Sequence, residues 1–215
     1  MSASTGLGDP PASLLGFPEA APVAELHRLS EFPGSWWFAS TEVDDHGGGR
    51  FDLPPPQGTC YLADSLTGAI VEKLLRTPVK VVVAERLDEL FHTVVTVRRT
   101  PTVADLTSRR ATGFGLNAEI HSTLEYGRTR RWAAAFHRNG FRGLRHRLRG
   151  DVSQRLAGWA LFGTAGLRRR APNGMATAVR PLDRLEVVRV LDRLGVELRP
   201  IPAVVPIASP STPRR

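Results

Sequence analysis

Residues 59 to 78 read TCYLADSLTGAIVEKLLRTP, and this stretch passes from a strand pattern into a helix pattern. Residues 59 to 63 are strand-like because apolar and β-prone side chains follow a long Gly/Pro loop at 44 to 57. Asp64 or Ser65 can cap the helix that follows, and Pro78 ends it. The apolar residues that share one face of this helix are Ile70, Val71, Leu74 and Leu75. The stretch therefore predicts one strand that leads directly into one helix.

Short apolar runs of the strand type dominate the rest of the chain. They cover residues 25 to 29, 36 to 39, 91 to 97, 103 to 106, 141 to 146 and 158 to 162. Two further helices are predicted, one at 129 to 138 that ends at Asn139-Gly140, and one at 182 to 194. The second should bury Leu185, Val188, Val190 and Leu191. Strand runs broken by isolated helices, with few regular βαβ units, predict an α+β fold with a mixed sheet flanked by helices.

The composition predicts one domain that neither crosses nor binds a membrane. The chain has 215 residues, of which 41% are hydrophobic and 23% charged. No apolar run approaches the ~20 residues of a membrane span, and residues 1 to 24 lack a signal-peptide pattern, so we expect a cytoplasmic protein. Residues 1 to 23 should be a poorly ordered lead-in or a strap over the surface, and residues 24 to 199 the domain. Residues 200 to 215 should form an extended Pro-rich tail.

The sequence offers neither an internal disulfide nor a metal cluster. Cys60 is the single cysteine and should be a small buried core residue. The six histidines are scattered without the spacing of a metal site, so we expect no metal. Asp44-Asp45-His46 is more typical of a solvated loop than of a cation site. Trp36 and Trp37 can wall a ligand cleft, but a place in the core is favoured.

The basic charge is a weak indication of nucleic-acid binding. The chain has 29 Lys+Arg against 21 Asp+Glu, for a net charge of +8, and Lys73 and Lys80 are the only lysines, which leaves 27 arginines. Such a skew can arise in a GC-rich genome without any selection for a polyanion. The arginine-rich stretches 128 to 131, 142 to 149 and 168 to 170 are expected to be solvated faces. Direct binding to nucleic acid is therefore disfavoured, whereas a small phosphorylated ligand suits arginine well.

The most informative segment for chemistry is Gly47-Gly48-Gly49-Arg50. A glycine run before an arginine lets the backbone approach a ligand while the guanidinium reaches forward, which suits a phosphate clamp. A flexible turn with a solvated arginine explains the same residues and is favoured by spacing alone. Tyr61 stands near a strand end, and Glu72 lies about two turns into the next helix, on or beside its apolar face. A carboxylate there is either an edge residue in water or a catalytic group.

Four pieces of the sequence occur in the order and at the spacing of one protein family. They are Leu26-His27-Arg28-Leu29, Gly49-Arg50-Phe51-Asp52, Tyr61-Leu62-Ala63-Asp64-Ser65 and Ala69-x-x-Glu72. Together they resemble the RES-domain family, the toxin half of bacterial RES–Xre toxin–antitoxin pairs. Residues 129 to 135, 140 to 146 and 160 to 162 look like the later helix and strands of that family.

The resemblance implies a fold similar to the ADP-ribosyltransferases and an activity that consumes NAD as a substrate. The reaction would be hydrolysis or phosphorolysis of the nicotinamide–ribose bond. By position, Arg28 and Arg50 match the family's two arginines, Tyr61 its tyrosine and Glu72 its glutamate. The resemblance thus implies Glu72, Tyr61 and Arg50 as catalytic residues and Arg28, Arg50 and Tyr61 as NAD-binding residues. An Xre-like antitoxin that covers the cleft is the implied protein partner.

The chain departs from the family at the family's serine. Many members read Tyr-x-Ser-Arg where this chain reads His146-Arg147-Leu148-Arg149, so Leu148 stands at the serine position, with Ser153 as a nearby substitute. Two alternatives to hydrolysis or phosphorolysis of NAD stay open: a protein ADP-ribosyltransferase of the same fold, and a catalytically idle module that binds a nucleotide or a protein. The acceptor, which is water, phosphate or a protein side chain, and the formation of a homodimer also stay open.

Overall fold

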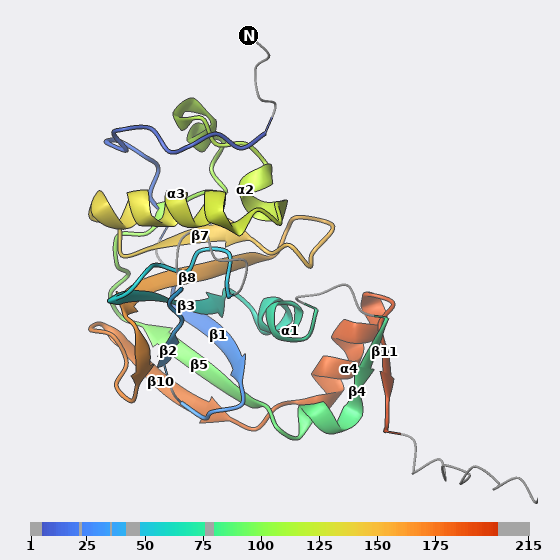
Figure 1. The fold of residues 1–215 in the computed structure, drawn as a ribbon. Coiled ribbons are helices and arrows are strands. Elements are labelled where there is room, and N and C mark those ends of the chain that lie inside the picture. The colour runs from blue at the N-terminus through green and yellow to red at the C-terminus, as the bar shows by residue number, and fades with distance from the viewer. Residues whose placement is uncertain (1–5, 22, 35, 42–47, 76–79, 202–215) are drawn as a thin grey trace, which may run out of the picture.

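A seven-stranded sheet forms the centre of the computed structural model, which describes residues 6–21, 23–34, 36–41, 48–75 and 80–201 (Figure 1). Neighbouring strands are antiparallel except for the last two in the spatial order, which are parallel, so the sheet is mixed. The strands, in spatial order, are β10 (Met175–Arg180), β5 (Phe91–Val97), β1 (Glu25–Ser30), β3 (Gln57–Ala63), β8 (Ala157–Thr164), β7 (Gly143–Arg147) and β6 (Ala104–Asp105).

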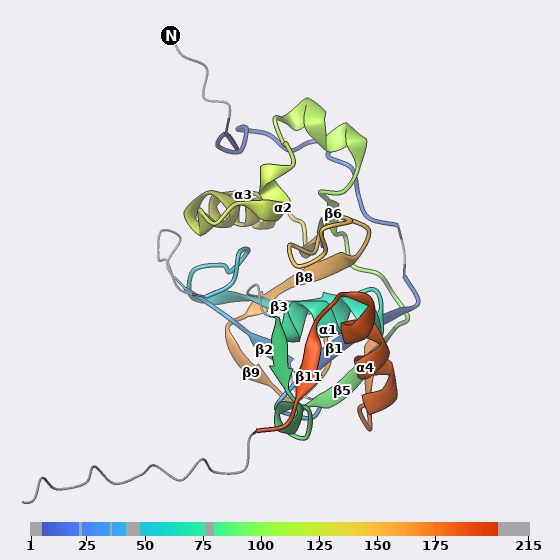
Figure 2. The same cartoon turned by 90° about the vertical axis from the view of Figure 1, so that its right-hand side faces the viewer.

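Helices and two small sheets flank the central sheet. Helix α3 (Tyr126–Arg138) lies over β7, together with α2 (Glu119–Ser122) and the 3₁₀ helix η2 (Arg109–Phe114) (Figure 1). Helices α1 (Leu66–Leu74) and α4 (Arg184–Arg193) pack together beside the parallel pair β4 (Val81–Val83) and β11 (Glu197–Arg199) (Figure 2). The remaining elements are the antiparallel pair β2 (Trp36–Phe38) and β9 (Gly166–Arg168), and the 3₁₀ helix η1 (Ala84–Leu87). This mixed sheet with flanking helices confirms the predicted α+β class.

The strand-to-helix stretch folds as its sequence predicts. β3 leads into α1 through Ser65, whose Oγ accepts a hydrogen bond from the Gly68 N–H at 3.1 Å. Helix α1 ends at Leu74, with Leu75 as its C-cap, before it reaches Pro78, which lies outside the described residues. Helix α3 begins at Tyr126, three residues before the predicted start, and ends at Arg138 as predicted.

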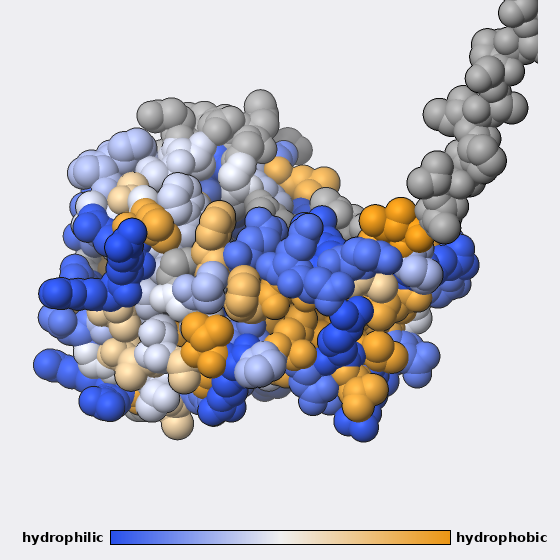
Figure 3. All heavy atoms as spheres, turned by 90° about the horizontal axis from the view of Figure 1, so that it is seen from below, coloured by the Kyte–Doolittle hydropathy of each residue, from blue (hydrophilic) through white to orange (hydrophobic). Residues whose placement is uncertain are grey.

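The predicted buried face of the last helix is partly wrong. In α4, Val187, Val190 and Leu191 are buried, whereas Leu185 is 68% exposed and Val188 is 42% exposed. Apolar residues occur on two sides of this helix, and only the side that meets α1 is covered. The lower face of the molecule, to which α4 and β10 belong, accordingly carries apolar side chains among charged ones (Figure 3).

Of the two expectations for the lead-in, the strap is the one that describes residues 6 to 21. Leu7, Leu14 and Phe17 are buried in the core cluster that lies under α3. The indole N–H of Trp132 in α3 donates to the Gly8 carbonyl at 2.8 Å, and Glu19 forms an isolated bridge with Ala104. The apolar side chains spaced through the Pro/Gly-rich segment give it enough buried surface to pay for its order. Residues 202 to 215 of the tail lie outside the described residues.

Within the described residues, no helix is both long enough and apolar enough to cross a membrane.

Candidate functional site

A cavity of about 680 Å³ opens where two central strands diverge. β1 and β3 share one Cα-paired position in the described sheet, His27 with Ala63, although β1 runs alongside β5 for six pairs and β3 alongside β8 for seven. Beyond that position the strands separate, and side chains from both reach the gap. The loop 48–53, helix α1 and strand β4 close the cavity around this gap.

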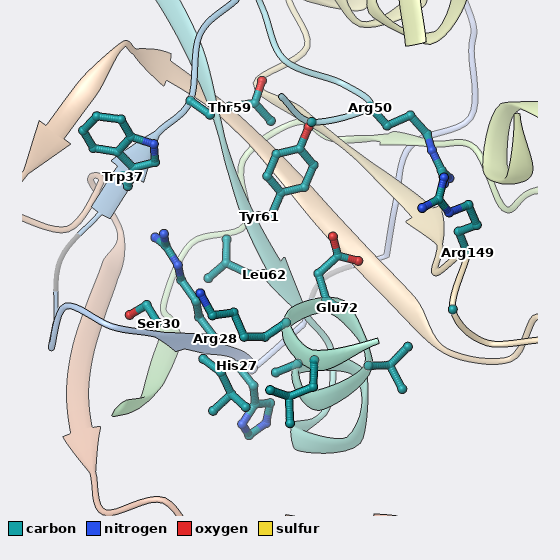
Figure 4. A pocket seen from close by; sticks show the side chains of 18 of the residues that line it. His27, Arg28, Ser30, Trp37, Arg50, Thr59, Tyr61, Leu62, Glu72 and Arg149 are labelled. Atoms are coloured by element: carbon teal, nitrogen blue, oxygen red, sulfur yellow. The ribbon is translucent and has the colours of Figure 1, made fainter. Parts of the chain in front are cut away.

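All four residues that the sequence singles out line this one cavity. Arg28 comes from β1, Arg50 from the glycine loop, Tyr61 from β3 and Glu72 from α1 (Figure 4). Their positions span 45 residues of sequence, so the strand divergence is what brings them together. The predicted grouping is therefore found in the structure, and their chemical roles remain predictions.

Glu72 projects from the exposed edge of α1 into the cavity. Its neighbours Val71 and Leu74 are buried in the core cluster shared with α4, which fixes the rotation of the helix. The Glu72 carboxylate points toward the Tyr61 ring (Figure 4). The backbone of Glu72 lies in a helix that is capped and packed against the core. The carboxylate is therefore held in place and still faces the cavity.

Tyr61 has its hydroxyl fully engaged by protein groups. The hydroxyl donates to Asp52 Oδ1 at 2.8 Å and accepts from the Phe51 N–H at 2.9 Å. Burial, followed by the Asp52 charge, raises the pKa of Tyr61 well above its ordinary value. The residue therefore stays protonated, and what it offers to a ligand is the face of its ring.

The loop that carries Arg50 is held by a frame of one local hydrogen bond, from Gly49 to Asp52, and two from Thr129 and Arg130 of α3. The Gly49 N–H donates to Asp52 Oδ2 at 2.6 Å, and Arg130 Nε donates to the Gly49 carbonyl at 3.1 Å. Thr129 Oγ1 donates to the Arg50 carbonyl at 2.5 Å. A side chain at Gly49 would put its Cβ 2.4 Å from the Tyr61 hydroxyl, which explains why glycine stands there.

Arg130 corrects the expectation that the stretch 128 to 131 is a solvated face. Its side chain is fully buried at 0% exposure, and it donates a hydrogen bond to the glycine loop. The sequence alone does not tell which arginines of such a run are buried, because the burial of each side chain depends on what packs against the helix.

Arg50 is buried, which excludes the solvated turn that spacing alone favoured. Its side chain is 9% exposed, and Nη1 donates to the His121 carbonyl. Its Nε is buried and has no hydrogen-bond partner among the described residues. Desolvation lowers the pKa of Arg50, and the nearby Arg149 charge lowers it further, against the opposing effect of Tyr126. The guanidinium nevertheless remains charged at neutral pH.

Arg28 reaches the cavity from the opposite side. Its Nη1 lies 3.1 Å from the sulfur of Cys60, to which it donates. Cys60 is fully buried, as predicted, and burial raises the pKa of its thiol. The thiol is therefore a packing and orienting group beneath Arg28.

Sequence reasoning missed several lining residues. Arg149 donates from Nη1 to the Tyr126 hydroxyl at 3.0 Å, and both line the cavity with Asp52 and His146. The signal that was available for Arg149 is its place in the family-like segment 146 to 149. Trp37 is 52% exposed at the cavity mouth, whereas Trp36 is buried, so the core assignment is right for Trp36 alone.

No serine replaces the family's serine among the residues that line the cavity near Glu72. Leu148 is fully buried against α1 and α4 and does not line the cavity. Ser153 is exposed in a turn, where its Oγ donates to Asp151 Oδ1 at 2.6 Å. Ser30 does line the cavity, but its hydroxyl donates to the Phe32 carbonyl at 2.8 Å.

Four of the described histidines, His27, His92, His121 and His146, pair with each other or with the backbone. His27 Nδ1 and His92 Nε2 are 3.1 Å apart in stacked rings. Burial lowers the pKa of His121 to about 4 and that of His146 to about 3. Across the described residues, no group of three or more His, Cys, Asp or Glu side chains could hold a metal ion. Asp44-Asp45-His46 lie outside that part of the chain.

Comparison with known proteins finds a match to one family model and a distant similarity to one solved structure. The family model described as the RES domain matches residues 25–170. Among solved structures, a chain in the crystal structure of the M. tuberculosis MbcT–MbcA toxin–antitoxin complex matches with a TM-score of 0.48 and 17% identity. That match covers 81% of this chain and 90% of the other. No curated protein sequence matches the chain.

Proposed function

The chain belongs to the RES domain family, and from that premise we propose that it is an enzyme that consumes NAD by cleaving the nicotinamide–ribose bond. The observation that carries the proposal is the convergence of Glu72 and Tyr61 with Arg28 and Arg50 around one cavity. A cavity of about 680 Å³ lies within the usual range of small-molecule sites.

The chemistry needs one carboxylate. The nicotinamide of NAD is already cationic, so the bond to ribose breaks without a strong general acid, unlike ordinary glycoside hydrolysis with its two carboxylates. Glu72 would hydrogen-bond a ribose hydroxyl and stabilise the oxocarbenium-like charge that develops as nicotinamide leaves. That interaction is stronger in the transition state than in the bound substrate, which is what accelerates a reaction.

The remaining residues would bind and orient the substrate. The arginines would hold phosphate oxygens through charge-assisted hydrogen bonds. Tyr61 would present its ring to the nicotinamide or its ribose, because its hydroxyl is committed to Asp52 and Phe51. Asp52 would act as a positioning residue, since it contacts Tyr61 and the glycine loop together.

The test is to incubate the purified protein with NAD and measure free nicotinamide, with Glu72→Gln as the variant. We expect release by the wild type, and loss of release in Glu72→Gln with a nearly unchanged thermal midpoint, because the change is isosteric on a capped helix. Glu89→Gln, an exposed glutamate outside the cavity, is the matched control. No release by the wild type at enzyme levels comparable to substrate would refute the proposal, and unfolding of Glu72→Gln would make that residue structural.

A catalytically idle binding module is the second candidate, and one observation favours it. Leu148, at the serine position, has no hydroxyl, and the hydroxyl of Ser153 donates to Asp151 away from the cavity. Under that alternative, NAD would bind tightly and be recovered intact after prolonged incubation. Transfer of labelled ADP-ribose to a protein band, without free ADP-ribose, would instead indicate a protein ADP-ribosyltransferase.

We further propose that the chain acts in the cytoplasm as a toxin that an Xre-like antitoxin neutralises by covering the cavity. The cavity mouth combines the cations Lys73 and Arg86 with half-exposed apolar groups, Trp37, Val81 and Val83. An acidic segment with apolar side chains is complementary to that rim. Growth arrest on expression, relieved by Glu72→Gln and by co-expression of an Xre-like antitoxin, is the expected result. Growth unaffected by the wild type would contradict the toxin role.

A further inference from the structure

The N-terminal strap holds two helices at once. The Leu7 N–H donates to Glu119 Oε2 of α2 at 2.5 Å, and the Leu7 carbonyl accepts from Arg128 Nη1 of α3 at 2.7 Å. The indole N–H of Trp132 in α3 donates to the next carbonyl of the strap, that of Gly8, at 2.8 Å. The beginning of the strap lies over α2 and α3, on the side away from the central sheet (Figures 1 and 2).

The same two helices fix the loop that carries Arg50. Thr129 Oγ1 of α3 donates to the Arg50 carbonyl at 2.5 Å, and Arg130 Nε donates to the Gly49 carbonyl at 3.1 Å. In α2, the His121 carbonyl accepts from Arg50 Nη1. Each residue that holds the loop stands one or two positions from a residue that holds the strap. A shift of either helix that follows loss of the strap would therefore move the groups that fix the loop.

A hydrophobic cluster also joins the strap to the loop. Leu7 and Phe17 of the strap are buried in the same cluster as Phe51 and Leu53, which belong to the Arg50 loop. The ring centre of Phe17 lies 4.7 Å from that of Phe136 in α3. Close-packed interiors transmit strain, because few voids exist to absorb a displacement. Packing and hydrogen bonds thus connect the strap to the loop through the same helices.

The residues at the contact between the strap and the helices lie outside the cavity. Leu7, Glu119 and Arg128 are not among the residues that line it. Any effect of these residues on a ligand must therefore pass through α2, α3 and the loop. The strap also lies outside residues 25–170, which the RES family model matches. Its influence on the site would be a feature of this chain that the family model does not include.

We propose that the strap is a positioning element of the active site, which keeps the Arg50 loop in its ligand-binding conformation by holding α2 and α3. Leu7 is then a positioning residue, since it touches neither the cavity nor the reacting atoms. Release of the strap would loosen the loop and weaken NAD binding, although every residue that lines the cavity is still present. The effect on NAD rests on the proposed function, whereas the effect on the loop does not.

Hydrogen exchange of the protein without ligand measures the loop directly. Leu7→Ala should raise the amide exchange rate of residues 48 to 53, relative to that of β8, by about tenfold or more, because the loop opens locally. Leu191→Ala is the matched control, since Leu191 and Leu7 are each 1% exposed but Leu191 packs in the cluster shared by α1 and α4. Leu191→Ala should leave this ratio unchanged, as should Leu15→Ala, at a strap residue that is 90% exposed.

Steady-state nicotinamide release measures the consequence for the substrate. Leu7→Ala should raise the KM for NAD by about fivefold or more, because Arg50 loses its orientation. A merely structural role would lower the apparent kcat and leave KM unchanged, since the molecules that remain folded have an intact site.

A second pair of variants tests the contact from the helix side. Arg128→Met removes the donor to the Leu7 carbonyl and should change the exchange ratio and KM in the same direction as Leu7→Ala. Arg128→Lys, which can still donate to that carbonyl, should restore part of both. Glu125→Gln is the matched control, because it removes the 2.7 Å ion pair of Arg128 and leaves the contact with the strap. It should change neither quantity.

Each result supports or overturns the positioning role. Unchanged loop exchange in Leu7→Ala and Arg128→Met overturns it, and so does an equal rise of the exchange ratio in Leu191→Ala. Faster loop exchange with an unchanged KM would show that the strap orders the loop without any effect on the site, which also overturns it. If the wild type releases no nicotinamide while Leu7→Ala still loosens the loop, the strap positions the loop and the proposed function alone fails. Should Leu7→Ala not fold, Arg128→Met and Glu125→Gln carry both measurements.

Discussion

Replacing Gly49 by alanine is expected to break the hydrogen-bond frame that holds the Arg50 loop. The new Cβ would lie 2.4 Å from Tyr61 Oη and 2.6 Å from Asp52 Oδ1, and these two atoms form the 2.8 Å hydrogen bond of the frame. Neither neighbour is the free end of an exposed side chain, because Tyr61 lies in β3 and Asp52 is buried. The clash can be relieved only by separating the atoms that the frame joins.

The magnitude follows from the bonds at risk. Asp52 accepts from the Tyr61 hydroxyl and from the Gly49 N–H, and a hydrogen bond to a charged group contributes about 1.5–3 kcal/mol. With partial relaxation of the loop, we expect the free energy of unfolding to fall by about 2–4 kcal/mol. A domain typically has about 5–15 kcal/mol, so the variant should still fold. Nicotinamide release should fall at least about tenfold, because Arg50 and Tyr61 lose their orientation.

Urea denaturation followed by tryptophan fluorescence measures the stability, and nicotinamide release from NAD measures the activity. Gly113→Ala is the control, because a Cβ there has no heavy atom within 4 Å. If Gly49→Ala keeps both its stability within about 0.5 kcal/mol of the wild type and its full activity, the frame does not position the site and the reasoning fails.

Three further predictions concern the core and its titration. The pKa of His121 is about 4 and that of His146 about 3 when folded, against 6.5 when unfolded, so stability should be lost as pH falls. Between pH 7 and pH 5, protonation of each histidine in the unfolded chain should lower the free energy of unfolding by about 2 kcal/mol. A denaturation midpoint that does not change with pH over that range would contradict this. Leu148→Ser should destabilise by about 3–5 kcal/mol without raising nicotinamide release, because the position is buried away from the cavity; faster release would show that it reaches the site. Phe17→Ala should cost about 3–5 kcal/mol in urea denaturation, whereas Leu15→Ala, 90% exposed on the same strap, should cost under about 0.5 kcal/mol, and equal effects would argue against a packed strap.

Local sequence predicted the elements whose pattern and boundary signals agree. Ser65 caps α1, and Gly140 with φ +87° follows the end of α3, as a stop signal should. The short strands β4, β9 and β11 were not predicted, since three residues carry too little periodicity. β10 was missed because its residues are mostly exposed at the edge of the sheet and lack an apolar alternation.

The candidate site divides in the same way. Arg28, Arg50, Tyr61 and Glu72 could be singled out because they stand in the pieces of sequence that resemble the RES-domain family. Arg130 and Tyr126 could not, because their importance comes from what α3 packs against. Arg130 lies in an arginine run that reads as a solvated face, yet it holds the Gly49 carbonyl 81 residues away in sequence.

The sequence by itself determined the α+β class, the strand-to-helix unit at 59 to 75 and the four candidate site residues that line the cavity. These depend on interactions between residues close in the chain, such as a cap, a periodic apolar face or a glycine before an arginine. Only the tertiary structure decided that β1 and β3 diverge to form the cavity, that residues 6 to 21 belong to the core, and that Leu148 points away from the site. Burial and charge compensation are properties of what surrounds a side chain in space, and the order of residues along a chain does not contain them.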